Sequence, residues 1–414
     1  MSDDTRRAIE AVWRIESARV IAGLTRIVRD VGLAEELAQD ALVRALEEWP
    51  QSGVPDNPGA WLMTAGKHRA IDLLRRRKMQ ERKHQEIGHE AEPEVPDIAE
   101  KLDDPVGDDL LRLVFIACHP VLSTEARVAL TLRLLGGLTT DEIARAFLVP
   151  EPTIAQRIVR AKKTLADKQV PFEVPRAAEL AARLASVLEV VYLVFNEGYS
   201  ATAGDDWTRP ALCEDALRLG RILAGLVPDE PEVHGLVALM AIQASRLRAR
   251  TGPTGEPILL LDQDRSRWDR VLISLGLSEL ERAEALTGVL GPYALQAAIA
   301  ACHARARTAG ETDWVRIAAL YAVLAQVTPS PIVELNRAVA VAMAHGPAAG
   351  LEILDRLVAD PALERYHLLP AARGDLLAKV GRTAEARAEL ERAASLTRNA
   401  RERDLLLARA AALD

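Results

Sequence analysis

Two helices joined by a tight turn are predicted by TTDEIARAFLVPEPTIAQRIVRAKKTL, residues 139–165. Thr139 followed by Glu142 has the spacing of a capping box, which starts a helix. The sequence Leu-Val-Pro at 148–150 ends that helix. Pro152 then stands where proline is tolerated, in the first turn of the next helix. The stretch therefore predicts a helix-turn-helix.

The second of these helices separates apolar from basic positions. Its spacing buries Ile154, Ile158 and Leu165 and turns several cations outward. In a helix-turn-helix such a helix enters the major groove, where early side chains read bases and cations contact phosphates. The alternative is an ordinary helical hairpin with a solvated basic face. The side chains predicted to contact DNA are Arg145, Thr153, Gln156, Arg157, Arg160, Lys162 and Lys163.

Composition favours an all-α chain of two or three domains. Of the 414 residues 49% are hydrophobic but only 4% aromatic, and strands prefer aromatic and β-branched residues. The net charge of −8 is unevenly distributed, because residues 86–109 hold ten acidic residues and only one basic residue. Without that segment, residues 1–169 are net basic. Two basic modules separated by an acidic tether fit nucleic-acid binding.

Cysteine usage and hydropathy exclude several classes of protein. Cys118, Cys213 and Cys302 are scattered in apolar helical runs, which predicts buried free thiols in a reducing compartment. Neither a metal-ligand spacing nor a cofactor motif is present, so we expect no metal and no cofactor. The N-terminus has no apolar signal segment and no apolar run could span a bilayer. We therefore expect a cytoplasmic protein that makes no membrane contact.

The periodicity divides the chain into four parts. Helices are predicted over 7–49, with breaks near 30–32 and 49–50, and from 58 into a basic run. A turn-rich loop lies between them. Helices resume at about 109–119, 123–135, 139–147 and 151–168. The predicted parts are two helical modules at 1–85 and 109–169, an acidic linker at 86–108 and a helical extension at 175–414.

Part of the extension, near residues 331–400, repeats with a period of 36. Small residues at presumed helix crossings alternate with large ones, which resembles the tetratricopeptide repeat. Coincidence in an Ala- and Leu-rich chain is the alternative. The recurring positions are Ala338, Val341, Gly350, Leu354 and Leu357, then Gly374, Leu377, Ala386, Leu390 and Ala393.

Along the chain, a helix pair is followed by a basic helix and then by the helix-turn-helix. With these features in this order, residues 7–168 resemble extracytoplasmic-function (ECF) bacterial RNA polymerase sigma factors. EELAQDALVRALEEW (35–49) resembles the region 2 helix that docks on the β′ clamp helices. WLMTAGKHRAIDLLRRR (61–77) resembles the stretch that melts and reads the −10 element. Residues 122–165 resemble region 4, which binds the −35 element. The resemblance implies core RNA polymerase, through its β′ clamp helices and β flap, and promoter DNA as partners.

The resemblance also assigns roles to individual side chains. Spacing alone would make the polar face of 35–49 a solvated helix surface, whereas the resemblance implies polymerase docking by Glu36, Gln39, Asp40 and Arg44. The −10 element is assigned to Asn57, Lys67, His68, Arg69, Arg75, Arg76 and Arg77. Since the loop before Trp61 captures a flipped −10 base in this family, the resemblance makes Asn57 the candidate for that capture. Trp61 is expected in the core. Two departures, Lys67-His68 in place of Arg-Asn and the proline-rich loop 50–58, put the sequence preference at the −10 element in doubt.

Residues 175–414 resemble the helical extension that a subgroup of these factors carries. Glu197, Tyr199, Asp262, Asp264 and His303 suggest an active site, yet no phosphate loop, metal spacing or nucleophile motif accompanies them. We interpret them as buried polar groups that pin loops between helices, and we expect no enzyme activity. The extension is expected to regulate or support activity, through a regulatory protein partner or by itself.

The sequence therefore predicts an alternative sigma factor. The first alternative is a polymerase-independent helix-turn-helix regulator whose repeat domain binds a ligand or a protein. The second is a repeat scaffold with vestigial DNA-binding modules. Against the first alternative, residues 35–83 would then have no purpose.

Overall fold

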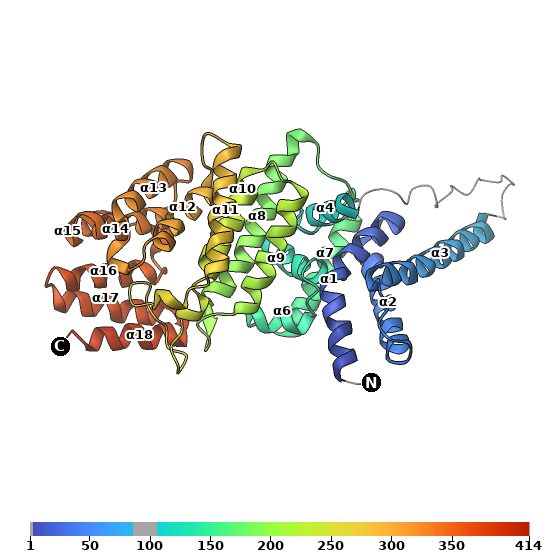
Figure 1. Cartoon of the computed structure of the whole chain (residues 1–414), viewed down its shortest axis with the longest axis horizontal. Helices are drawn as coiled ribbons and strands as arrows, with labels where there is room; N and C mark the ends of the chain where they lie inside the picture. Colours follow the sequence, from blue (N-terminus) through green and yellow to red (C-terminus); the bar gives the residue numbers. More distant parts are fainter. Residues whose placement is uncertain (1–2, 86–105, 414) are drawn as a thin grey trace. The chain divides into compact units, whose positions relative to one another are not determined.

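The computed structural model describes residues 3–85 and 106–413, and this part of the chain is all-α, as predicted (Figure 1). Its helices run from α1 to α18, and its only strands are the two-residue β1 and β2. The chain divides into two compact units, residues 1–190 and 191–414. Among the described residues no helix is long and apolar enough to cross a membrane.

The N-terminal module, residues 3–85, contains α1 (Asp3–Val28), α2 (Val31–Ser52) and α3 (Pro58–Gln85). The break predicted near 30–32 is present, and the side chain of Asp30 caps α2 by accepting from the backbone N–H of Leu33. The break predicted at 49–50 is misplaced. Pro50 is exposed and forfeits only one helical hydrogen bond, so α2 continues to Ser52.

Two tryptophans join α2 to α3. Trp49 is fully buried, and Trp61 packs edge-on against it with ring centroids 5.2 Å apart. Trp61 itself is half-buried: it packs on the buried Trp49, but it is not enclosed in the core as expected. The apolar side of α3 is thereby fixed against α2, which leaves the opposite side of α3 to the solvent.

The helix-turn-helix module contains α4 (Val106–Ala117), α5 (Thr124–Leu134), α6 (Thr140–Phe147) and α7 (Glu151–Asp167), close to the predicted bounds. The capping box at Thr139 is confirmed in both directions. Leu148 ends α6 in the left-handed conformation, at φ +50°, and Pro152 lies in the first turn of α7. Ile154, Ile158 and Leu165 are buried as predicted.

Replacing Thr139 by alanine is expected to destabilise the helix-turn-helix by about 1 kcal/mol. The Thr139 hydroxyl accepts from the N–H of Glu142 at 3.1 Å, and the Glu142 carboxylate accepts from the N–H of Thr139 at 2.8 Å. Faster amide hydrogen exchange over α6 and α7 would report the loss. Thr139→Ser keeps the acceptor and should exchange like the wild type; equal exchange in all three proteins would contradict the prediction.

Helix α8 (Ala177–Tyr199) begins in the first unit and packs its first half on the helix-turn-helix module. Arg183 donates to the carbonyl of Phe115 at 2.8 Å, and Ser186 donates to the carbonyl of Cys118 at 2.7 Å. Arg127 pairs with Glu189 at 3.0 Å. The module is predicted to end at residue 169, whereas the compact unit continues to residue 190.

The second unit is a succession of helix hairpins. Helices α16, α17 and α18 lie side by side in chain order (Figure 1). β1 (Ala203–Gly204) pairs in parallel with β2 (Arg398–Asn399), and Asn399 donates to the carbonyls of Ala201 and Asp206, so the start and the end of the unit are joined. The other helices are α9 (Pro210–Leu226), α10 (Pro231–Ala244), α11 (Arg270–Leu286), α12 (Pro292–Arg305), α13 (Trp314–Val327), α14 (Pro331–His345), α15 (Pro347–Leu357), α16 (Leu368–Lys379), α17 (Thr383–Leu396) and α18 (Ala400–Ala411).

The small residues of the 36-residue repeat lie where helices cross closely. A Cβ on Gly350 would lie 2.7 Å from the carbonyl oxygen of Ala338, which brings α15 against α14. A Cβ on Gly374 would lie 3.1 Å from that of Ala386, which brings α16 against α17. The close approaches explain why these positions are small; the tetratricopeptide assignment stays a prediction.

In the second unit, arginines donate hydrogen bonds to the C-terminal carbonyls of two helices, which have no partner within their own helix. Arg250 donates to the carbonyl of Tyr199, the last residue of α8. Arg265 donates to the carbonyls of His303 and Ala306 at the end of α12, at 2.7 and 2.9 Å. A guanidinium at a helix C-terminus satisfies orphan carbonyls and faces the negative end of the helix dipole. These side chains therefore hold loops to helices.

The three cysteines are free and buried, as the sequence predicted. Burial raises the pKa of the Cys118 thiol to about 11 and that of Cys213 to about 12. Such thiols carry little thiolate at neutral pH and are poor nucleophiles.

Candidate nucleic-acid interface

Helix α7 presents a polar and basic face to the solvent. Gln156, Arg160 and Lys163 are exposed, and Thr153 and Arg157 are half-buried. These side chains lie opposite the buried Ile154, Ile158 and Leu165, because α7 rests its apolar side on α5 and α6. Five of the seven side chains predicted to contact DNA in this module thus lie on α7 and form no ion pair with a carboxylate of the described residues.

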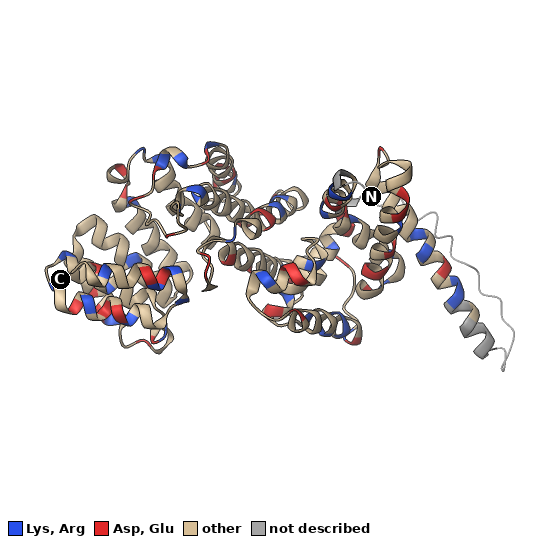
Figure 2. Ribbon diagram, turned by 90° about the horizontal axis from the view of Figure 1, so that it is seen from below, with Lys and Arg blue, Asp and Glu red and all other residues tan. Residues whose placement is uncertain are grey.

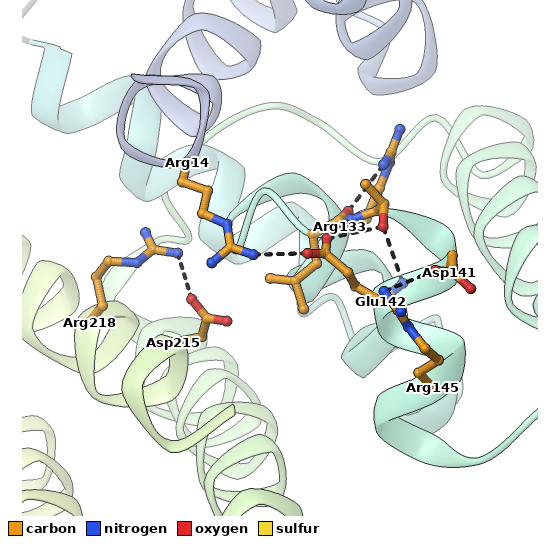
Figure 3. Close-up of polar contacts among 9 residues, drawn as sticks. Arg14, Arg133, Asp141, Glu142, Arg145, Asp215 and Arg218 are labelled. Carbon is orange, nitrogen blue, oxygen red and sulfur yellow. Dashed lines mark hydrogen bonds and ion pairs between the residues drawn. The ribbon is translucent and has the colours of Figure 1, made fainter. Parts of the chain in front are cut away.

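The other two predicted side chains are engaged in ion pairs. Arg145 on α6 pairs with Asp141 one turn earlier, at 2.9 Å, and both are exposed (Figure 3). An exposed pair of this kind is worth little, so Arg145 can exchange Asp141 for a phosphate. Lys162 is different, because it binds the buried carboxylate of Glu35 on α2.

Helix α3 carries the second basic surface. His68, Arg69, Arg75 and Arg76 are exposed and Lys67 is half-buried. Figure 2 shows Lys and Arg recurring along this helix. A row of cations on one helix attracts a nucleic-acid backbone and holds a single strand without reading its sequence. The side chain of Arg77, also predicted to contact DNA, lies outside the described residues.

Asn57 has a structural role as well as the predicted one. Its side-chain oxygen accepts from the backbone N–H of Ala60 at 3.0 Å, so Asn57 caps the N-terminus of α3. The residue is exposed, and the cap uses only the oxygen of the amide. If Asn57 captures a base, its amide nitrogen is therefore the atom that donates the hydrogen bond to that base.

The α2 residues predicted to dock on the polymerase differ in exposure and in their hydrogen bonds. Glu36, Asp40 and Arg44 are exposed, whereas Gln39 is half-buried and donates to Glu35 at 2.7 Å. Arg44 donates to Glu48 at 2.8 Å and lies over the Trp61 ring. A face with three charged side chains therefore remains open on this helix.

Asp40 and Arg69 connect the two predicted faces of the N-terminal module. Their side chains pair at 3.0 Å between α2 and α3, and both are more than half exposed. They line a cavity of about 410 Å³ together with Val43, Arg44 and His68. Val43 is 51% exposed although it is apolar, which a partner that covers this face would explain. Sequence reasoning missed Val43, because periodicity does not distinguish an exposed apolar position from a core one.

Comparison with known proteins assigns these modules. The Sigma-70 region 2 family model matches residues 14–79, and the Sigma-70, region 4 model matches residues 112–165. These two modules belong to the sigma-70 family. A third model, a family of unknown function (DUF6596), matches residues 183–284. The N-terminal module is thus sigma region 2, and the helix-turn-helix module is sigma region 4.

Several known proteins are similar to this chain, and some of them are named as ECF sigma factors. An uncharacterized protein of Rhizobium meliloti, R00370, is 43% identical over 93% of this chain and 90% of its own length. A probable ECF RNA polymerase sigma factor of Mycobacterium tuberculosis, SigI, is 25% identical over 41% of this chain and 58% of its own. The ECF RNA polymerase sigma factor SigK of a Mycobacterium species is 29% identical over 36% and 77%. No solved structure matches.

The polar residues that suggested an active site beyond the two sigma regions make structural contacts. Glu197 is buried and binds Arg209 and Thr202. Asp262 and Asp264 are exposed, which corrects the expectation that they are buried. The carboxylate of Asp264 accepts from the backbone N–H of Ser266 at 2.9 Å. Burial, with two nearby arginines, lowers the pKa of His303 to about 3, so its ring is neutral. Among the described residues no cluster of His, Cys, Asp and Glu could hold a metal ion.

Proposed function

We propose that this protein is an alternative sigma factor of the ECF class, which binds core RNA polymerase and directs it to its own set of promoters. The observation that carries the proposal is the pair of basic helix faces, on α3 in region 2 and on α7 in region 4, in sigma order along one chain. The charged face of α2 stands beside the first of them.

Each face has a distinct part in this proposal. The α2 face, with Glu36, Asp40 and Arg44, docks on the β′ clamp helices, and region 4 also contacts the β flap. The α3 cations hold the strand that leaves the duplex at the −10 element. On α7, Gln156 and Arg157 read bases at the −35 element, since their side chains match adenine and guanine edges. Arg160 and Lys163 contact the DNA phosphates.

The extension, residues 191–414, is proposed to regulate or support this activity rather than to catalyse a reaction. A regulatory protein partner would bind it in the cytoplasm, where the polymerase acts. Removal of the extension tests this, but truncation at Lys168 would also strip Arg183 and Ser186 from region 4. A chain that ends at Tyr199 keeps α8 whole. Higher activity without the extension means that it inhibits, and lower activity means that it is required.

Run-off transcription with purified core polymerase on the promoter of the protein's own operon tests the proposed function. Replacing Gln39 and Arg44 together by alanine is expected to weaken core binding about 30- to 700-fold, because polar side chains at an interface centre cost about 1–2 kcal/mol each. Affinity for DNA alone should not change. Arg6→Ala, an exposed arginine of α1 that pairs with Glu10, is the matched control.

Failure of the wild-type protein to initiate transcription, together with DNA binding in the absence of polymerase, would replace the sigma factor by the helix-turn-helix regulator. Failure of both would favour the scaffold.

A further inference from the structure

Glu35 is a buried carboxylate that joins the two sigma regions. It lies on α2 of region 2 with only 3% of its surface exposed. Arg133 of α5 donates to it at 2.6 Å, and Lys162 of α7 binds its other oxygen. Both cations belong to region 4. A carboxylate removed from water in this way persists only where such partners compensate its lost hydration.

Further ion pairs cross the same interface. Arg14 of α1 donates to Glu142 of α6 at 2.8 Å (Figure 3), and Arg26 of α1 pairs with the buried Asp109 of α4 at 2.9 Å. Gly32 lies where α2 meets α7, since a Cβ there would lie 3.9 Å from the Cβ of Lys162. The two regions are therefore packed together in this structure.

This packing conflicts with simultaneous use of both promoter elements. Their names place the −10 and −35 elements about 25 base pairs apart, which is about 85 Å along B-form DNA at 3.4 Å per base pair. Regions joined through side chains in direct contact cannot reach both. Moreover, the ammonium group of Lys162 is directed to the buried carboxylate of Glu35, which neutralises the charge that a DNA phosphate would otherwise attract.

We propose that this packing is a closed state of the protein, and that Glu35 is the latch that holds region 4 on region 2. This proposal deepens the proposed function and rests on it. Promoter binding then requires that Glu35 release Arg133 and Lys162, and Lys162 exchanges a carboxylate for a DNA phosphate. The exposed α2 face stays open in the closed state, so polymerase can dock before the latch opens.

Glu35→Gln tests the latch with almost no change in side-chain volume. Without the carboxylate charge, Arg133 and Lys162 face each other as like charges, and closure is disfavoured. An apparent affinity falls with the fraction of molecules in the competent state. We therefore expect run-off transcription at limiting protein to rise about tenfold. Glu10→Gln, which breaks an ion pair inside region 2, should leave transcription unchanged; equal activity of Glu35→Gln and wild type overturns the proposal.

A disulfide tests the closed state independently. Cβ atoms about 3.5–4.5 Å apart suit a disulfide, so the double variant Gly32→Cys, Lys162→Cys should cross-link in the full-length protein under a mild oxidant. The native cysteines are buried and should not compete. The oxidised protein should lose promoter-specific transcription at least tenfold relative to the same protein treated with dithiothreitol.

The outcomes separate the latch from the proposed function. Absence of a cross-link, or full transcription by the cross-linked protein, overturns the latch while the sigma assignment stands. If the reduced double variant is also inactive because Lys162 is lost, Glu35→Gln decides instead. If wild type never initiates with core polymerase, the proposed function fails, and the latch fails with it even if the cross-link shows that the regions pack together.

Discussion

Replacing Arg75 and Arg76 together by alanine is expected to lower promoter-directed run-off transcription about 30- to 100-fold. Both are exposed on α3, where the proposed function places the strand leaving the −10 element. Each lost phosphate contact costs about 1 kcal/mol or more, and 1.4 kcal/mol is a factor of ten. Both changes are on a solvent-facing helix surface and keep good helix formers, so folding should survive.

Salt dependence separates this electrostatic role from a structural one. Each phosphate contact contributes about 0.9 to the slope of log affinity against log salt on duplex DNA and about 0.7 on a single strand. The double variant should therefore show a slope shallower by about 1.4 to 1.8. Arg6→Ala, Arg7→Ala on α1 of the same module is the control. Unchanged transcription or an unchanged slope would remove α3 from the promoter interface.

Replacing Arg265 by alanine is expected to destabilise the second unit by about 3 kcal/mol or more. Its guanidinium is 7% exposed and donates to His303, Ala306 and Thr312. Alanine would leave buried carbonyls at the end of α12 without a donor, and a lost hydrogen bond to a charged group costs about 1.5–3 kcal/mol. The guanidinium also lies 4.8 Å from the centre of the Trp268 ring.

Urea unfolding followed by tryptophan fluorescence would measure this loss, because Trp268 and Trp314 lie within the affected region. Arg265→Lys keeps the charge but cannot reach several acceptors at once, and should recover only part of the stability. Arg267→Ala, an exposed neighbour, is the matched control. An unfolding midpoint for Arg265→Ala equal to that of the control would show that the α12 carbonyls do not depend on it.

Local features of the fold could be predicted from the sequence because their causes lie within a few residues. The capping box at Thr139, the end of α6 at Leu148 and the buried positions of α7 all depend on neighbours one or two turns away. The expected crossing of small residues at Gly350 is of the same kind. Such signals are strong because a helix repeats its own geometry.

Contacts between distant segments could not be predicted in this way. Glu35 meets Arg133 98 residues further on, and nothing in the pattern of α2 separates a buried glutamate from a solvated one. Asn57 is predicted to capture a base, yet its side-chain oxygen caps α3. The motif Asn-Pro-Gly-Ala is compatible with both roles. The placement of the candidate DNA side chains on α3 and α7 followed from helical spacing, whereas their pairing with Asp40 and Glu35 did not.

Helix α8 also affects when region 4 can complete its folding during synthesis on the ribosome. The carbonyls of Phe115 and Cys118 find their donors 68 residues later in the chain. The ribosome adds about 5–20 residues per second, so these donors are synthesised roughly 3–14 s after the carbonyls that they bind. A nascent chain that has emerged only as far as α7 therefore exposes an unfinished module, and a slow codon placed before residue 183 would prolong that exposure.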